Sequence, residues 1–215
     1  MPRWRLRVDS NANGHDRAVR VTGQFAPLLG ALIGALGGAI YWLGMQVWPS
    51  SVALILSMAS TALITARMQG AMPDARLEAS SWMLCLLIKY NALMALSAAK
   101  LPFAVPANVP LGFIMICGYA ASFALLVSVT VLRPAKSAPT LGNGALALAL
   151  LIGFAPAALL GIPGLIGLAA AILAALGILA FLKFRRAGSS HDARTVQWLT
   201  EACFYLGALA TWRYV

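Results

Sequence analysis

The chain has 215 residues, of which 61% are hydrophobic and 10% carry a charge. A soluble domain has about 45–50% apolar and about 25% charged residues, so this composition excludes an ordinary water-soluble globule. It predicts an all-α integral membrane protein, a polytopic bundle of transmembrane helices. The net charge of +10 does not indicate a nucleic-acid partner, because the basic residues stand singly or in short clusters between long apolar runs.

The first part of the chain is polar, and the rest is largely apolar. Residues 1–24 form a basic lead segment, which we predict to be cytoplasmic, and residues 25–215 are predicted to form one transmembrane helical domain. Residues 9–15, rich in Asp, Asn and Gly, predict irregular backbone. No short apolar core with a cleavage site precedes the first long run, so no cleavable signal peptide is expected.

Seven apolar runs predict about seven spans, at residues 25–47, 52–65, 82–99, 111–132, 145–160, 165–182 and 196–214. The first run holds Gly30, Gly34 and Gly38 at steps of four, a spacing that lets helix backbones approach closely in lipid. Trp42 and Trp48, at the far end of that run, suit an interfacial belt.

The links between runs differ in kind. Residues 100–110 carry three prolines and cannot be helical throughout, whereas the sequence GIPG at residues 161–164 predicts a tight turn.

Cys85, Cys117 and Cys203 all fall inside apolar runs without metal-ligand spacing, so we interpret them as small buried hydrophobic residues.

The basic residues indicate an orientation. Thirteen of the 16 Lys and Arg residues lie in the lead segment or after the second, fourth and sixth runs. The positive-inside rule therefore predicts a bacterial cytoplasmic (inner) membrane protein with its N-terminus in the cytoplasm and its C-terminus outside. Five of the six acidic residues map to the same side, which predicts that polar chemistry occurs at the cytoplasmic face.

Two charged residues lie inside apolar runs. Lys89 is near the middle of the third run, about 12 Å from either end, and Glu201 is the one acidic residue within a run. A charge at that depth is costly and usually faces a partner or a wet cavity. We predict that Lys89 and Glu201 approach each other; the alternative is that each faces its own water-filled crevice.

The C-terminal stretch VQWLTEACFYLGALA, at residues 196–210, resembles the end of the cobalamin (5′-phosphate) synthase family, also called adenosylcobinamide-GDP ribazoletransferase. In that family a Gly-Asp loop leads into a VQQLTE helix, so Asp192 matches the loop aspartate and Glu201 the helix glutamate. Further similar stretches occur in family order: PLLG at residues 27–30, AIYWLGMQ at 39–46, SVALILSMAST at 51–61, MPDARL at 72–77 and LLIKY at 86–90.

The resemblance implies a Mg²⁺-dependent transferase that joins adenosylcobinamide-GDP to α-ribazole, or its 5′-phosphate, and releases GMP at the membrane, alongside other membrane proteins of cobalamin biosynthesis. It implies Asp74 and Asp192 as magnesium ligands and Arg76 as a phosphate clamp. His191, beside Asp192, is a further candidate for phosphate contact. The alternative reading of Asp74 and Arg76 is a solvated turn between helices.

Two departures from the family pattern are visible. The family's acidic motif H-x-D-G-L-A-D-x-x-D-G is absent after the second run, where TARMQG at residues 65–70 leads almost directly to Asp74. Tyr119-Ala-Ala-Ser-Phe stands where the family has a Ser-Arg pair. These departures keep a second hypothesis open, a non-catalytic scaffold or corrinoid-binding member. A small transporter ranks last, because no internal repeat or paired broken helix is apparent.

Overall fold

The structure is a computed structural model that describes residues 12–68, 76–98, 108–132, 142–185 and 190–212. Within these ranges the regular secondary structure consists of seven α-helices: α1 (Ala12–Gly44), α2 (Ser50–Met68), α3 (Arg76–Ala98), α4 (Asn108–Leu132), α5 (Asn143–Leu159), α6 (Ile162–Arg185) and α7 (Ser190–Trp212). The predicted all-α class is confirmed for this part of the chain.

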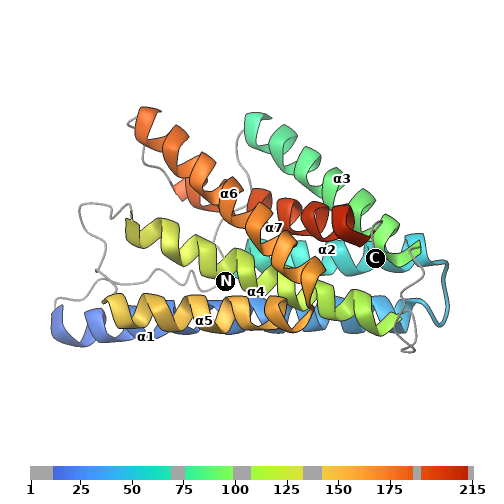
Figure 1. The fold of residues 1–215 in the computed structure, drawn as a ribbon, viewed down its shortest axis with the longest axis horizontal. Coiled ribbons are helices and arrows are strands. Elements are labelled where there is room, and N and C mark those ends of the chain that lie inside the picture. Colours follow the sequence, from blue (N-terminus) through green and yellow to red (C-terminus); the bar gives the residue numbers. More distant parts are fainter. Residues whose placement is uncertain (1–11, 69–75, 99–107, 133–141, 186–189, 213–215) are drawn as a thin grey trace, which may run out of the picture.

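Successive helices run back and forth along the long axis of the molecule (Figure 1). α1, α5 and α7 begin toward the left of the view and α3 begins at its top, and all four run toward the right, whereas α2, α4 and α6 run the opposite way. The start of α1 therefore lies toward the same side as the ends of α2, α4 and α6. The predicted alternation of the apolar runs is present in the fold.

Among the described residues, four helices are long and apolar enough to cross a membrane. Their candidate spans are Gln24–Gly44, Ser50–Arg67, Leu111–Leu132 and Ile162–Phe181. Met83–Ala98 and Asn143–Leu159 are shorter apolar stretches. The chain thus has the features of a helical membrane protein, while the count of seven spans stays a prediction.

α4 is the central helix of the bundle. It packs against α1, α3, α5, α6 and α7. In its apolar stretch 72% of the residues are buried, against 22–33% in the other three candidate spans. Such a helix, apolar all round, is buried by protein, whereas a helix with one covered face leaves its remaining apolar side chains outward.

The glycine row of α1 forms its contact with α4, as the spacing predicted. A Cβ atom placed on Gly34 would lie 2.7 Å from the Cα of Ile116, and one on Gly38 would lie 2.8 Å from the Cα of Gly112. These distances are shorter than any ordinary carbon contact, so only glycine permits the backbones to lie this close. In lipid the hydrophobic effect does not drive helices together, so van der Waals packing of the two close backbones stabilises their association instead.

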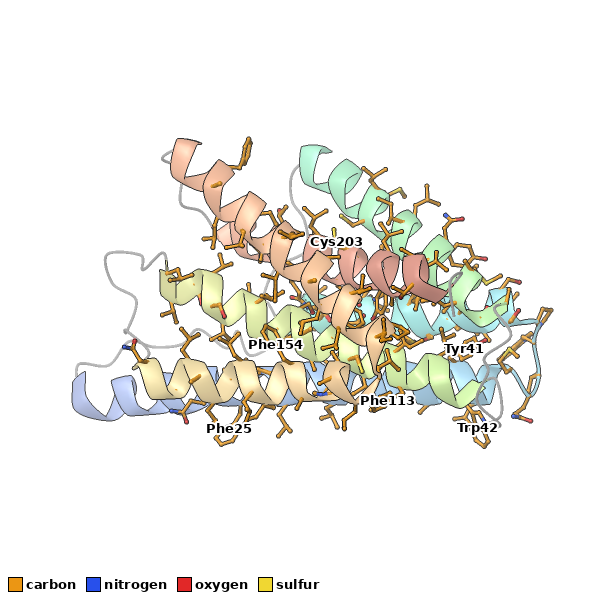
Figure 2. The ribbon with its side chains drawn as sticks, in the orientation of Figure 1. Phe25, Tyr41, Trp42, Phe113, Phe154 and Cys203 are labelled. Atoms are coloured by element: carbon orange, nitrogen blue, oxygen red, sulfur yellow. The ribbon has the colours of Figure 1, made fainter. Side chains whose placement is uncertain are left out.

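Aromatic side chains mark the two ends of the apolar stretch of α1. Figure 2 shows Phe25 and Trp42 pointing away from the bundle, and both are about half exposed. Seventeen residues of α-helix separate them, or about 26 Å, close to the roughly 30 Å thickness of a bilayer core. Leu28, Leu32 and Leu36 lie exposed between them, as expected of a lipid-facing surface.

Two predictions about segments outside the apolar runs, residues 9–15 and residues 161–164, can be compared with the structure. Residues 9–15 were expected to be irregular, but α1 already begins at Ala12, so that expectation is wrong for residues 12–15. The helix is extended beyond the apolar stretch because its backbone hydrogen bonds do not depend on apolar side chains. The tight turn at residues 161–164 is confirmed: α5 ends at Leu159, α6 begins at Ile162, and Gly161 adopts φ +74°, a left-handed conformation that glycine adopts without strain.

Candidate functional site

A buried ion pair joins α3 to α7. Lys89 Nζ donates a hydrogen bond to Glu201 Oε1 at 2.5 Å, and the two residues are 5% and 4% exposed. The predicted pairing of Lys89 with Glu201 is therefore confirmed, and the alternative of two separate crevices is wrong. Because desolvated charges are costly unless they are paired and hydrogen-bonded, each residue needs the other at this depth.

Two tyrosines complete the cluster. Lys89 Nζ also donates to Tyr119 Oη on α4 at 2.8 Å and lies 4.3 Å from the centroid of that ring. Tyr205, one turn beyond Glu201 on α7, donates from Oη to Glu201 Oε1 at 3.1 Å. Both rings are buried. The ammonium is thus held by a carboxylate, a phenol oxygen and an aromatic face.

The sequence positions these groups through helix spacing and one glycine. Glu201 and Tyr205 are four residues apart, so they share one face of α7. That face reaches α4 at Gly118, where an added Cβ would lie 2.6 Å from atoms of the Tyr205 ring. Any larger residue at Gly118 would displace Tyr205 and, with it, the hydrogen bond to Glu201.

Hydrogen-bonding capacity remains in the cluster. Among the described residues, Glu201 Oε1 accepts both the Lys89 and the Tyr205 hydrogen bonds, and Oε2 accepts none. Lys89 uses two of its three N–H donors on these same residues. One charged acceptor and one charged donor are therefore available at neighbouring positions.

A small pocket of about 30 Å³, partly open to the outside, adjoins the ion pair. Its lining comes from four helices and includes Thr65 of α2, Leu86 and Lys89 of α3, Tyr119 of α4, and Trp198 and Glu201 of α7. The lining residues of α3 and α7 other than the ion pair precede Lys89 and Glu201, so the pocket extends toward the ends where α3 and α7 begin.

The lining of the pocket extends close to the end of α2. Thr65 is three residues before the last residue of α2, or about 5 Å along the helix. α2 is held in place by Ser57, whose Oγ donates to the carbonyl oxygen of Gly37 on α1 at 2.7 Å. The pocket therefore lies on the side of the bundle that the basic residues predict to be cytoplasmic.

Of the other predicted site residues, Arg76, His191 and Asp192 lie at the beginnings of α3 and α7, toward this same side. Asp74 falls outside the described residues. Arg76 begins α3, and His191 and Asp192 lie in the first turn of α7, but the side chains of all three are outside the description. α3 and α7 pack against each other. Asp192 precedes Glu201 by nine residues, about 13 Å of helix.

The described side chains do not form a metal centre. In the ranges that the structure covers, no three His, Cys, Asp or Glu side chains are grouped as metal ligands. Glu201 is the one acidic residue whose side chain is described, and the positive charge of Lys89 lies 2.5 Å from it. A second cation at this carboxylate would be repelled by that ammonium.

Sequence reasoning missed Tyr119 and Tyr205. Tyr205 could have been found from its spacing of four residues from Glu201 on a predicted helix. Tyr119 gives no such signal, because its partner Lys89 lies 30 residues away on a different helix.

The comparisons with known proteins give one partial match. No family model matches the chain, and no solved structure matches it. The chain is similar to the adenosylcobinamide-GDP ribazoletransferase of Leptothrix cholodnii, with 51% identity over 39 residues. That match covers 18% of this chain and 15% of the relative.

Proposed function

We propose that this chain is a membrane transferase of cobalamin biosynthesis that joins adenosylcobinamide-GDP to α-ribazole, or its 5′-phosphate, with release of GMP. The observation that carries the proposal is the 51% identity over 39 residues to the Leptothrix ribazoletransferase. The four apolar candidate spans support a membrane setting. The ordered family-like stretches, ending with residues 196–210, support the same reaction.

The proposed reaction is a phosphoryl transfer. A ribose hydroxyl oxygen of α-ribazole, one that stays free when position 5′ carries phosphate, forms a bond to the phosphorus that is attached to cobinamide. The bond from that phosphorus to the oxygen of GMP breaks, GMP leaves with the bonding electrons, and the hydroxyl proton passes to solvent. Positioning and charge neutralisation supply most of the catalysis in such reactions.

Asp74 and Asp192 are the proposed magnesium ligands, and Arg76 is the proposed clamp on the pyrophosphate. Bound there, Mg²⁺ would neutralise phosphate charge, for which a few carboxylates and several waters suffice. The residues whose side chains are described do not make such a site on their own. His191 is proposed as a further phosphate contact.

The membrane arrangement is part of the proposal. We place seven spans in a bacterial cytoplasmic membrane, with the N-terminus in the cytoplasm and the C-terminus outside. The alternating helix directions and the 13 basic residues on one predicted side support this arrangement. It would place Arg76 and Asp192 at the cytoplasmic face, where both soluble nucleotides and membrane intermediates are accessible.

The proposal is tested by complementation. A bacterium that lacks its own cobalamin synthase, and whose growth requires cobalamin made from cobinamide, would receive the wild-type chain or a variant. We expect growth with wild type and with Glu78→Gln, which removes a carboxylate in the first turn of α3 that has no proposed role in the reaction. Growth should fail with Asp74→Asn and Asp192→Asn at equal membrane levels of protein.

A second function is favoured by the absent acidic motif: a scaffold or corrinoid-binding member of the family without turnover. No growth with a correctly inserted wild-type chain would reject the transferase and leave this function. Growth with both Asp variants would keep the transferase but reject the proposed magnesium ligands.

A further inference from the structure

The pocket beside Lys89 and Glu201 has room for about one water molecule. Its volume of about 30 Å³ is close to the share of one molecule in liquid water, and about a tenth of the smallest sites for organic ligands. A nucleotide, a sugar or any other organic substrate is therefore too large for it. The size of the pocket limits its occupant to a water molecule or a single small ion.

The charges at the pocket wall favour a neutral occupant. Lys89 Nζ and Glu201 Oε1 lie 2.5 Å apart, so their formal charges cancel. An anion would be attracted by the ammonium but repelled by the carboxylate, and a cation would meet the reverse. Either ion would also lose most of its hydration shell in so small a space, which is costly. Water is therefore favoured over both kinds of ion.

The pocket wall offers three polar groups with hydrogen-bonding capacity. Among the described residues, Glu201 Oε2 accepts no hydrogen bond, and Lys89 uses two of its three N–H donors. Thr65 Oγ1 donates to the carbonyl oxygen of Thr61 at 2.8 Å, so its own lone pairs can still accept. Thr65, Lys89 and Glu201 are each at most 5% exposed. Polar groups at that depth are costly without partners, and a buried water typically makes about three hydrogen bonds to such groups.

We infer that this pocket is the binding site of one ordered water molecule, which accepts a hydrogen bond from Lys89 Nζ and donates to Glu201 Oε2 and Thr65 Oγ1. This water joins the end of α2 to the ion pair between α3 and α7. It goes beyond the proposed function, because no substrate group enters the pocket. It also links three helices near the side of the bundle where Arg76 and Asp192 lie in the first turns of α3 and α7.

The chain offers two matched pairs of variants. Ala62 lines the pocket, so Ala62→Leu would fill the space for the water, whereas Ala59→Leu adds the same side chain at an exposed position of α2. Thr65→Val removes the proposed acceptor at almost unchanged size. Thr130→Val is its control, because Thr130 also donates to a carbonyl of its own helix, at 2.8 Å, and does not line the pocket.

The experiment is a crystal structure of the full chain, grown from lipid, at a resolution that shows ordered waters. Crystals soaked in sodium bromide and in rubidium chloride identify bound ions by their anomalous scattering. We expect one isolated oxygen peak within hydrogen-bond distance of Lys89 Nζ and Glu201 Oε2, without anomalous signal, in wild type, Ala59→Leu and Thr130→Val. The peak should vanish in Ala62→Leu and lose occupancy in Thr65→Val, which removes one of its three partners.

Three results would overturn the inference. An anomalous peak at this position would make it an ion site, and a pocket without density beside other well-ordered waters would exclude a bound water. Unchanged occupancy in Thr65→Val would reject the link to α2. In solution, the midpoint of unfolding by SDS should fall further in Thr65→Val than in Thr130→Val, and equal shifts would reject that link as well. None of these outcomes depends on turnover, so the water site and the proposed transferase fail separately.

Discussion

Breaking the Lys89–Glu201 pair should destabilise the bundle strongly. At 2.5 Å and an effective dielectric constant of about 20, the direct attraction is about 6–7 kcal/mol, and the desolvation of both charges offsets much of it. Removing one partner leaves the other buried and uncompensated. We therefore expect Glu201→Gln and Lys89→Met each to lower the free energy of unfolding by about 3–5 kcal/mol.

The double variant Lys89→Met/Glu201→Gln should recover part of this loss. With both charges gone, no uncompensated ion remains in the core, so we expect the double variant to be more stable than either single variant. The coupling energy, which is the sum of the two single losses minus the loss in the double variant, should then exceed either single loss and so lie at or above the upper end of the roughly 0.5–3 kcal/mol typical of residues in contact. Arg67→Met is the control, because Arg67 is exposed and its loss should change stability by less than about 0.5 kcal/mol.

The assay is reversible unfolding of the detergent-solubilised protein by SDS in mixed micelles, followed by tryptophan fluorescence. If both single variants unfold within about 0.5 kcal/mol of wild type, a margin typical of surface substitutions, the pair contributes nothing to the core and the reasoning is refuted. Additive effects in the double variant would also refute it, since additivity means that Lys89 and Glu201 do not interact.

Three further predictions can be measured in the same unfolding assay. Gly38→Ala should destabilise the bundle by about 2 kcal/mol or more, because its Cβ would lie 2.8 Å from the Cα of Gly112; Gly177→Ala, with no atom within 4 Å, should instead stabilise α6 by up to about 1 kcal/mol. Equal effects at the two glycines would contradict the close α1–α4 contact. Tyr119→Phe should cost about 1.5–3 kcal/mol, as expected for a hydrogen bond to a charged group, and a cost near zero would show that Glu201 alone satisfies Lys89. Ser57→Ala should cost about 1 kcal/mol through the lost hydrogen bond to Gly37, whereas unchanged stability would mean that this bond does not secure α2 on α1.

The parts of the fold that could be predicted from sequence are those fixed by local pattern. Apolar runs located the helices, and the steps of four among Gly30, Gly34 and Gly38 indicated a close helix contact. The pairing of Lys89 with Glu201 could be predicted because each is a charged residue inside an apolar run, where the other is the available partner of opposite charge. For the ion pair, the high cost of leaving either charge unpaired inside an apolar run leaves the other charge as the expected partner.

The remaining features depend on contacts between distant parts of the chain. α4 is central because five other helices pack around it. No pattern within residues 108–132 indicates which helices these are. The pocket takes its walls from four helices, so no single segment signals it. Tyr119 joins Lys89 only because α3 and α4 approach each other at these two residues.

The most direct test of the proposed transferase is product formation in vitro. Purified protein in nanodiscs would be incubated with adenosylcobinamide-GDP, α-ribazole and Mg²⁺, and the cobalamin product and GMP would be quantified by chromatography and mass spectrometry. The transferase predicts equal amounts of both, lost in Asp192→Asn and retained in Glu78→Gln. Folded, correctly inserted wild-type protein that forms neither product nor GMP would contradict it.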